Sequence, residues 1–283
     1  MKKITVKVPA KINLTLDILG ANENYHEISS LVTSIDIYDE ITVAKRSDYK
    51  ITLTMKGLPV DCSVPDNNAF KAGVLFQDTF KTRGFDITVD KKIPVAGGLG
   101  GSSADIAGVL NALNLLFEID MNMEKLAAEL GSDAPYMLKG GYAVISGRGE
   151  KIERLPFNKT LFLLLITENA NVSARACYKK YDQRKREYPP CTAKAVTALT
   201  NDDDNALIEA VKNDLGNAAC EIVQQIKFNL FALNKAGVGK AIVAGSGPTV
   251  LGFYADKKAR DKAYKKLAPL FGENLIKAKT VVQ

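Results

Sequence analysis

The first eighteen residues alternate between apolar and polar side chains. Apolar residues occupy every second position from Ile4 to Ile18, and the polar residues between them include Lys7, Lys11, Asn13 and Asp17. Successive side chains of a strand point to opposite faces, so this pattern predicts one long strand, or two strands bent at Pro9. One face of it should lie in a core. Shorter apolar runs predict further strands at residues 35–43, 51–55 and 85–89.

The spacing of apolar residues changes after the glycine-rich residues 97–101. From there the apolar positions follow a helical spacing, at Ile106, Leu110, Leu113 and Phe117. This spacing predicts an amphipathic helix. A shorter helix is predicted at residues 124–130, because Gly131 after it is a suitable C-terminal cap.

The remaining chain mixes strands and helices without a strict βαβ order. The predicted elements are a hairpin at 141–155 turning at Gly147-Arg148-Gly149, a buried strand at 161–167, a basic helix or loop at 173–187, one helix from Ala219 to Leu233 stopped by Gly237, two strands around an SGP turn, a basic helix and a final strand at 276–282. This order predicts an α+β protein with two domains, 1–156 and 157–283, divided near Leu155-Pro156.

The composition is typical of a globular protein with its own core. Of the 283 residues, 46% are hydrophobic and 25% are charged, and no apolar run approaches the ~20 residues of a membrane span. The alternating N-terminus does not resemble a signal peptide. The cysteines are scattered without a CxxC pair, which argues against a disulfide framework or a zinc site and favours a reducing cytoplasm.

The net charge of +6 is concentrated near the C-terminus. Residues 256–283 carry a net charge of +5, which raises the possibility of a nucleic-acid partner. The lysines there alternate with Ala259, Ala263 and Leu267 at helical spacing, and no recognition motif accompanies them. A solvated helix face is therefore the favoured interpretation, and we expect neither a nucleic-acid nor a membrane partner.

The glycine-rich stretch IPVAGGLGGSSAD, residues 93–105, is the first candidate for chemistry. Glycines let the backbone approach a phosphate closely, and the amides of the following helix start attract anions. The stretch lacks the Gly-Lys-Ser/Thr of a P-loop, and Ser103 stands where a dinucleotide fingerprint has its third glycine. The alternative is a tight strand-to-helix turn without a ligand.

Three shorter segments are further candidates, each with a structural alternative. Lys11 and Asn13 share the strand face opposite the core, where they could contact a substrate or simply face solvent. Asp133, in GSDAP, is either an acidic group of a site or an ordinary helix N-cap. Tyr25 and His26 could stack on and hydrogen-bond a nucleobase, although a lone histidine is more often structural.

Together, these segments resemble the GHMP kinases, a superfamily of small-molecule kinases without a P-loop. PAKINL (9–14), PVAGGLGGSSA (94–104) and AGSGPTV (244–250) resemble its three motifs in the same order. The resemblance implies an N-terminal ribosomal-protein-like β-α domain and a C-terminal ferredoxin-like α/β sandwich. It also implies ATP as phosphoryl donor, accompanied by Mg²⁺. The sequence has no dense carboxylate cluster that would call for a metal site built by the protein itself.

The resemblance also implies roles for single residues. The expected ATP-binding residues are Pro94, Val95, Ala96, Gly97, Gly98, Leu99, Gly100, Gly101, Ser102, Ser103 and Ala104. Gly245, Ser246 and Gly247 would form a supporting glycine-rich turn. Asp133 would accept or orient the proton of the acceptor hydroxyl, and Lys11 would pair with it and stabilise developing negative charge.

Tyr25-His26-Glu27, residues 131–135 and residues 147–150 resemble one sub-family, which acts in isoprenoid precursor synthesis. Its acceptor is a cytidyl diphosphate sugar-alcohol phosphorylated on the tertiary 2-hydroxyl. The resemblance implies that Asn13 positions substrate hydroxyls and that Tyr25, His26 and Tyr178 hold the cytosine. The partners expected are these two small molecules, with the protein a monomer or a homodimer.

The chain departs from the sub-family at a few positions. Asn22-Glu23-Asn24 replace an Asp-Gly turn, Ser102 and Ala104 replace a glycine and a serine, and Ala174 replaces a threonine. Two alternatives stay open: another GHMP kinase, of homoserine or mevalonate type, and a non-catalytic ATP-binding regulator with the same fold. The small aliphatic substrate of the first alternative offers no base on which Tyr25-His26 could stack. The second alternative, without phosphoryl transfer, would not need both Lys11 and Asp133.

Overall fold

The computed structural model describes residues 2–21, 25–184 and 189–281. The chain forms two compact units, and each unit is assembled from several separate segments of the sequence. Unit 1 contains Met1–Ala10, Ile37–Val95 and Gly100–Gly140, and unit 2 contains Lys11–Asp36, Ala96–Leu99 and Gly141–Gln283. The α+β prediction is confirmed. The division into two domains near residue 156 stays a prediction, because the segments of the two units alternate along the sequence.

The sheet of unit 1 is built from β1 (Lys3–Asn13), β3 (His26–Lys45), β5 (Phe85–Lys91) and β4 (Ile51–Gly57). β1 pairs with β3, β3 runs antiparallel to β5, and β4 runs parallel to β5. Only the last part of β3 belongs to this unit. β3 is much longer than the strand predicted at residues 35–43, because its earlier residues pair within unit 2.

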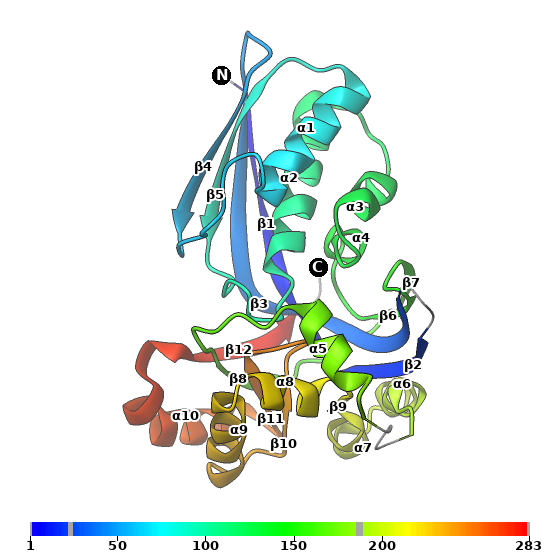
Figure 1. Ribbon diagram of the computed structural model, residues 1–283, viewed down its shortest axis with the longest axis vertical. Coiled ribbons are helices and arrows are strands. Elements are labelled where there is room, and N and C mark those ends of the chain that lie inside the picture. Colours follow the sequence, from blue (N-terminus) through cyan, green and yellow to red (C-terminus); the bar gives the residue numbers. More distant parts are fainter. Residues whose placement is uncertain (1, 22–24, 185–188, 282–283) are drawn as a thin grey trace. The chain divides into compact units, whose positions relative to one another are not determined.

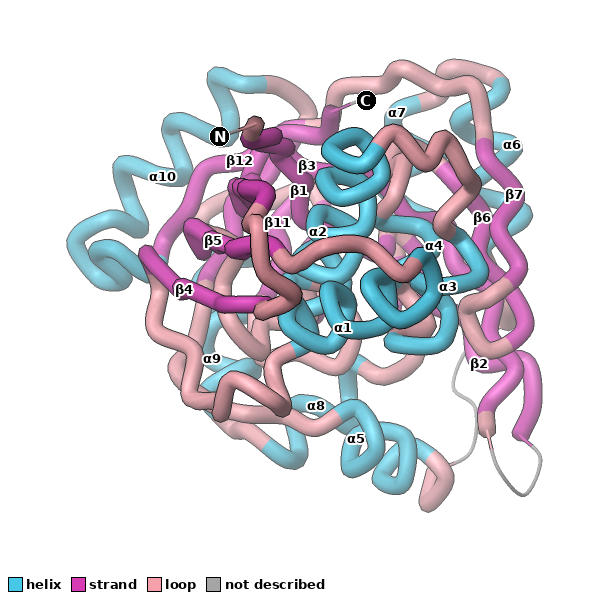
Figure 2. Tube along the Cα trace, turned by 90° about the horizontal axis from the view of Figure 1, so that it is seen from above, coloured by secondary structure: helices cyan, strands magenta, loops and turns pink. Residues whose placement is uncertain are grey.

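Four helices accompany the sheet of unit 1: α1 (Asn68–Phe80), α2 (Gly101–Phe117), α3 (Glu124–Leu130) and α4 (Ala134–Met137). Figures 1 and 2 show them gathered side by side, with α1 against β4 and β5. Helix α2 lies close to the sheet because Gly108 has no side chain: a Cβ there would lie 2.5 Å from Ile41 Cδ1. The helices at α2 and α3 confirm the predictions, whereas α1 was not predicted although Asn67 caps it.

The sheet of unit 2 has the antiparallel order β10 (Lys240–Val243), β11 (Val250–Tyr254), β8 (Phe162–Ile166) and β12 (Leu275–Val281). β12 continues onto β3, which is flanked by β2 (Thr15–Ala21) and β6 (Ala143–Gly147). β6 and β7 (Lys151–Arg154) form the predicted hairpin. The short β9 (Lys212–Asn213) pairs in parallel with β2.

Helices α9 (Gln225–Lys235) and α10 (Lys257–Phe271) pack on the β10–β12 sheet (Figure 1). α5 (Ala174–Tyr181) packs on α8 (Gly216–Ile222), and α6 (Thr192–Thr200) packs on α7 (Asp204–Ala210) and β2. The 3₁₀ turn η1 (Gly272–Asn274) leads into β12. Helix α10 buries Ala263 and Leu267 and exposes its lysines, as predicted for a solvated helix face.

The prediction of one helix from Ala219 to Leu233 is wrong. Helix α8 ends at Ile222, Val223 is extended with φ −127° and ψ 101°, and α9 begins at Gln225. The apolar stripe that suggested one helix is divided, because Ile222 is exposed and Ile226 is buried. Helices α6 and α7 were also not predicted. In the described part of the chain, no helix has the length and apolar character needed to cross a membrane.

Candidate active site

Lys11 and Asn13 lie at the end of β1, within unit 2, and both are buried. The two residues are 6% and 3% exposed, so the interpretation as a solvent-facing strand is wrong. The Lys11 ammonium donates to Asn13 Oδ1 over 2.9 Å, and the Lys11 amide donates to the Leu99 carbonyl over 3.0 Å. A buried lysine is therefore held beside the backbone of the glycine-rich stretch.

A chain of hydrogen bonds continues from Asn13 into unit 2. Asn13 Nδ2 donates to Ser30 Oγ over 2.7 Å, and Ser30 Oγ donates to the Thr15 carbonyl. The Thr15 hydroxyl accepts from the Leu31 amide over 2.8 Å and lies 2.8 Å from the Thr192 hydroxyl. Both amide atoms of Asn13 therefore contact protein groups, which holds Asn13, and with it Lys11, in one orientation.

The same chain ends at Asp17, which is fully buried. Asp17 Oδ2 accepts from the Thr192 hydroxyl over 2.7 Å and from the amides of Thr192 and Cys191 over 2.8 and 2.9 Å. Lys212 Nζ lies 3.2 Å from Asp17 Oδ1 and 2.9 Å from Asp214. Burial favours a higher pKa for Asp17, but the hydrogen bonds from Thr192, Cys191 and Lys212 outweigh it and lower this pKa.

Two glycine turns meet in unit 2. Gly98 has φ +76°, and a Cβ on it would lie 2.0 Å from the Ala244 carbonyl oxygen. Gly245, with φ +52°, faces Gly98 in turn, since a Cβ there would lie 3.2 Å from the Gly98 carbonyl oxygen. Any larger residue at Gly98 would have to move the backbone of the other turn.

The ring residues Tyr25, His26 and Tyr178 also belong to unit 2. The His26 and Tyr178 rings stack with centroids 4.6 Å apart, and His26 Nε2 lies 2.6 Å from Asp182 Oδ1. The Arg148 guanidinium, in the β6–β7 turn, lies 5.2 Å from the centroid of the Tyr25 ring. A base between two rings needs a separation of roughly 7 Å, twice a van der Waals contact, so none fits between His26 and Tyr178 as they stand.

Asp133 belongs to unit 1, where it precedes the short helix α4. It occupies the N-cap position, but its side chain makes no capping hydrogen bond, so the interpretation as a plain N-cap is wrong. The segment before it packs on the start of α2, since a Cβ at Gly131 would lie 3.6 Å from Ser103 Oγ. The carboxylate segment therefore neighbours a helix N-terminus that begins at Gly101 and carries Ser102 and Ser103.

Unit 1 also contains a buried cluster of charged residues that was not predicted from the sequence. Lys91 Nζ lies 2.6 Å from Asp39 Oδ2 and 2.9 Å from both Asp105 Oδ2 and the Gly101 carbonyl. Burial raises the pKa of Asp105 to about 7, while the positive charge of Lys91 opposes that rise. The signal was present in the sequence, because Lys91 continues the alternation of buried Phe85, Ile87 and Val89.

Similarity to known proteins agrees with these geometries. The profile of the GHMP kinases N terminal domain matches residues 67–143. A 4-diphosphocytidyl-2-C-methyl-D-erythritol kinase from Moorella thermoacetica is 33% identical over 98% of this chain and 99% of its own length. The chain belongs to this kinase family.

Other relatives support the same family. A 4-diphosphocytidyl-2-C-methyl-D-erythritol kinase from Brevibacillus brevis is 35% identical over 94% of this chain and 92% of its own length. The crystal structure of a 4-(cytidine 5'-diphospho)-2C-methyl-D-erythritol kinase superposes with a TM-score of 0.81, at 24% identity, over 99% of this chain and all of its own. The fold is therefore that of a GHMP kinase.

The residues expected from the kinase resemblance are divided between the two units. Asp133, Pro94, Val95 and residues 100–104 belong to unit 1. Lys11, Asn13, residues 96–99, the ring residues and Gly245-Ser246-Gly247 belong to unit 2. The pairing of Lys11 with Asp133 and the joint binding of ATP therefore stay predictions. The departure at Asn22-Glu23-Asn24 lies outside the described residues.

Proposed function

We propose that this chain transfers the γ-phosphoryl group of ATP to the 2-hydroxyl of 4-diphosphocytidyl-2-C-methyl-D-erythritol, giving the 2-phosphate and ADP in isoprenoid precursor synthesis. The observation that carries the proposal is the position of the Asp133 segment against the start of α2. There a carboxylate that could receive a hydroxyl proton neighbours helix amides that attract phosphate.

The expected reaction needs alignment and charge stabilisation more than covalent work by the protein. The acceptor oxygen bonds to the γ-phosphorus while the bond from that phosphorus to the β–γ bridging oxygen breaks, and ADP leaves. The hydroxyl proton passes late to Asp133, because an alcohol holds its proton more tightly than a carboxylate does. Mg²⁺ enters with ATP as part of the substrate.

Lys11 would stabilise the negative charge that develops during transfer. Its burial and its 2.9 Å hydrogen bond to Asn13 Oδ1 support this role, because a fixed ammonium needs little reorganisation during the reaction. For Asn13, the bonds to Lys11 and Ser30 support the role of orienting Lys11 more directly than contact with substrate hydroxyls.

The base of the acceptor would stack on Tyr25, which is 43% exposed and backed by Arg148. Tyr178, which stacks on His26, would contact the other face of the base. The four free cysteines support a reducing compartment, and we propose the cytoplasm as the place of the reaction.

The reaction is tested by ADP release from purified protein with Mg-ATP and a panel of acceptors. We expect release with the cytidyl substrate and none with homoserine, mevalonate or galactose. Release with another acceptor would keep the kinase and discard the base site. Absence of release with every acceptor, despite ATP binding, would favour a non-catalytic ATP-binding protein.

The role of Asp133 is tested by Asp133→Asn, which keeps the shape of the side chain. We expect kcat to fall by roughly 10²–10⁴-fold while ATP binding is retained. Glu129→Gln, on the exposed surface of α3, is the matched control and should leave kcat unchanged. Near-normal turnover of Asp133→Asn would contradict the assignment. For Tyr25→Ala we expect a raised KM for the cytidyl substrate and a similar KM for ATP.

A further inference from the structure

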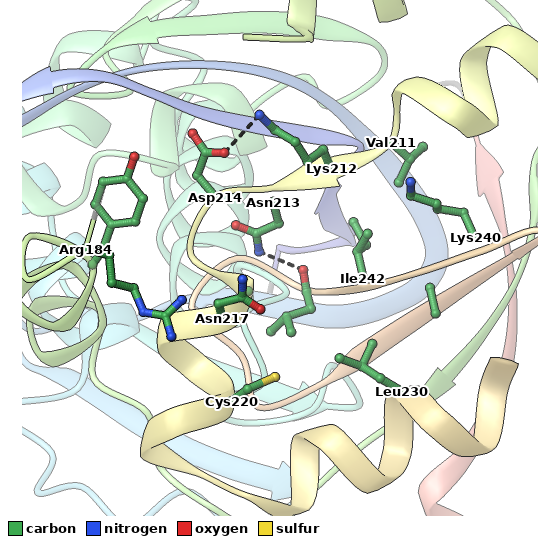
Figure 3. A pocket seen from close by; sticks show the side chains of 14 residues that line it. Arg184, Val211, Lys212, Asn213, Asp214, Asn217, Cys220, Leu230, Lys240 and Ile242 are labelled. Atoms are coloured by element: carbon green, nitrogen blue, oxygen red, sulfur yellow. Dashed lines mark hydrogen bonds and ion pairs between the residues drawn. The ribbon is translucent and has the colours of Figure 1, made fainter. Parts of the chain in front are cut away.

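Unit 2 contains a hollow of about 190 Å³ that none of the expected substrate-binding residues lines. It lies among the end of α5, the β9 strand, helices α8 and α9 and the strand β10 (Figure 3). An apolar cavity on the order of 150 Å³ is large enough to hold benzene. The hollow therefore has room for a ring-sized molecule with a small head group.

The lining combines an apolar wall with charged groups. Val211, Leu230, Ile242 and Val243 form the wall, together with the buried thiol of Cys220. The charged residues of the lining are Arg184, Lys212 and Lys240 against the single carboxylate Asp214. Figure 3 shows Arg184 and Lys240 on opposite sides of the hollow.

The three cations differ in how they are held. Lys212 lies between Asp214 and Asp17, and Arg184 contacts Glu221. Lys240 makes no ion pair with any residue that the structure describes. An anion between Arg184 and Lys240 would be attracted by the charge of Lys240, and it would face the Arg184 guanidinium on the opposite side of the hollow.

Two connections run from this lining toward the candidate active site. Asn213 Nδ2 donates to the Val243 carbonyl over 2.8 Å and to the Gly245 carbonyl over 2.6 Å, and Gly245 is in close contact with Gly98. Lys212 contacts Asp17, where the hydrogen-bonded chain toward Lys11 ends. Both connections lie within unit 2.

We propose that this hollow is a regulatory binding site for a small organic phosphate with a compact apolar body. The apolar body contacts Leu230, Ile242 and Val243, and the phosphate lies between Arg184 and Lys240. Occupation restrains Lys212 and Asn213 and so changes the positions available to Gly98 and Lys11. Such coupling between sites is carried by contiguous packed and hydrogen-bonded groups, and it must be measured.

Binding is tested by calorimetry on the full chain with phenyl phosphate, a ring of suitable size that carries the required head group. We expect saturable binding, with inorganic phosphate and benzyl alcohol each at least ~10-fold weaker, since each lacks half of the recognised features. Equal binding of inorganic phosphate would overturn the apolar part of the site. Absence of saturable binding by phenyl phosphate would overturn the site itself.

Variants locate the binding. Lys240→Ala should weaken phenyl phosphate about 10-fold, and Asn217→Trp should abolish its binding by filling the hollow from an exposed position. Lys258→Ala, which removes an exposed lysine of α10, is the charge-matched control and should bind normally. Undiminished binding to Asn217→Trp would place the ligand elsewhere, for example in the nucleotide site, and would overturn the proposal.

The regulatory role is tested by measuring the KM for ATP with and without phenyl phosphate. We expect phenyl phosphate to change the KM for ATP about 5-fold in the wild-type protein and to leave it unchanged in Asn217→Trp. An equal change in both proteins would show competition at the nucleotide site, and binding without any change would overturn the regulatory role. The calorimetric result does not depend on the acceptor of the kinase, so failure of either proposal leaves the other standing.

Discussion

Asp105 in unit 1 and Asp17 in unit 2 are both buried aspartates, yet their pKa values shift in opposite directions. Asp105 shares one ammonium, that of Lys91, with a second carboxylate, and its Oδ1 atom has no hydrogen-bond partner among the residues that the structure describes. Asp17 receives two backbone amides, a hydroxyl and an ammonium. At Asp105 the effect of burial on the pKa outweighs the charge of the single ammonium, whereas at Asp17 the hydrogen-bond donors together outweigh the effect of burial.

The two clusters also hold different parts of the expected site. The Lys91 cluster joins β3 and β5 to the first residue of α2, so it fixes the helix start through charge. The Asp17 chain joins β2 to α6 and β9 and continues to Lys11 mainly through neutral hydrogen bonds. Loss of a single charged group should therefore cost more in the first cluster than in the second.

The largest effect is expected for Lys91→Met, which leaves Asp39 and Asp105 buried without their cation. The free energy of unfolding should fall by about 3–5 kcal/mol, measured by urea denaturation. Lys92→Met is the matched control, since Lys92 makes an exposed ion pair with Asp90, and its loss should stay below about 1 kcal/mol. A similar small loss for Lys91→Met would refute the view that charge holds this cluster.

Asp17→Ala should follow, with a loss of about 3 kcal/mol in the same measurement. It removes the acceptor of two buried amides, the Thr192 hydroxyl and one contact of Lys212. Asp36→Ala is the control, because its carboxylate accepts a backbone hydrogen bond from Lys279 at an exposed position. If both variants lost the same small amount of unfolding free energy, the hydrogen bonds around Asp17 would not contribute substantially to the stability of the protein.

Asp105→Asn should have a smaller effect that depends on pH. The raised pKa of Asp105 keeps its proton in the folded protein at pH values where the unfolded chain has lost it, so stability falls as the pH rises from 3.8 toward about 7. The variant should lack this slope and exceed the wild type by about 1–2 kcal/mol at high pH. Asp17 has the opposite sign, since its lowered pKa contributes stability that is lost only as the pH falls below 3.8.

Urea denaturation of the wild type and of Asp105→Asn at several pH values above 4 measures the slope that the variant should lack. Asp90→Asn, which changes a partly exposed carboxylate on β5, the strand that carries Lys91, is the control and should keep the wild-type slope. An unchanged slope in Asp105→Asn would assign the pH dependence to other groups.

The smallest effect is expected for Ser30→Ala, which interrupts the chain between Asn13 and Thr15. Loss of one neutral acceptor should lower the free energy of unfolding by about 1–2 kcal/mol. If Asn13 orients Lys11, kcat should also fall severalfold while the KM for ATP stays the same. Ser29→Ala, the half-buried neighbour on β3, should change neither quantity.

Much of the local structure could be predicted from the sequence. The alternation from Ile4 to Ile18 predicted strands, and the helical spacing after Gly101 predicted α2, because these periods depend only on neighbouring residues. The break between α8 and α9 could not be predicted in this way. Each short helix buries a different face, and only the packing around them determines which face is buried.

For the candidate site, the sequence by itself determined which segments carry the motifs, including the Lys11 and Asp133 segments. Only the tertiary structure decided that Lys11 and Asn13 are buried and that Asp17 meets Thr192, a residue 175 positions away. The hollow beside Lys240 was likewise invisible in the sequence. Periodicity tells which face a side chain occupies, whereas the partner across that face depends on strand register and helix packing between distant segments.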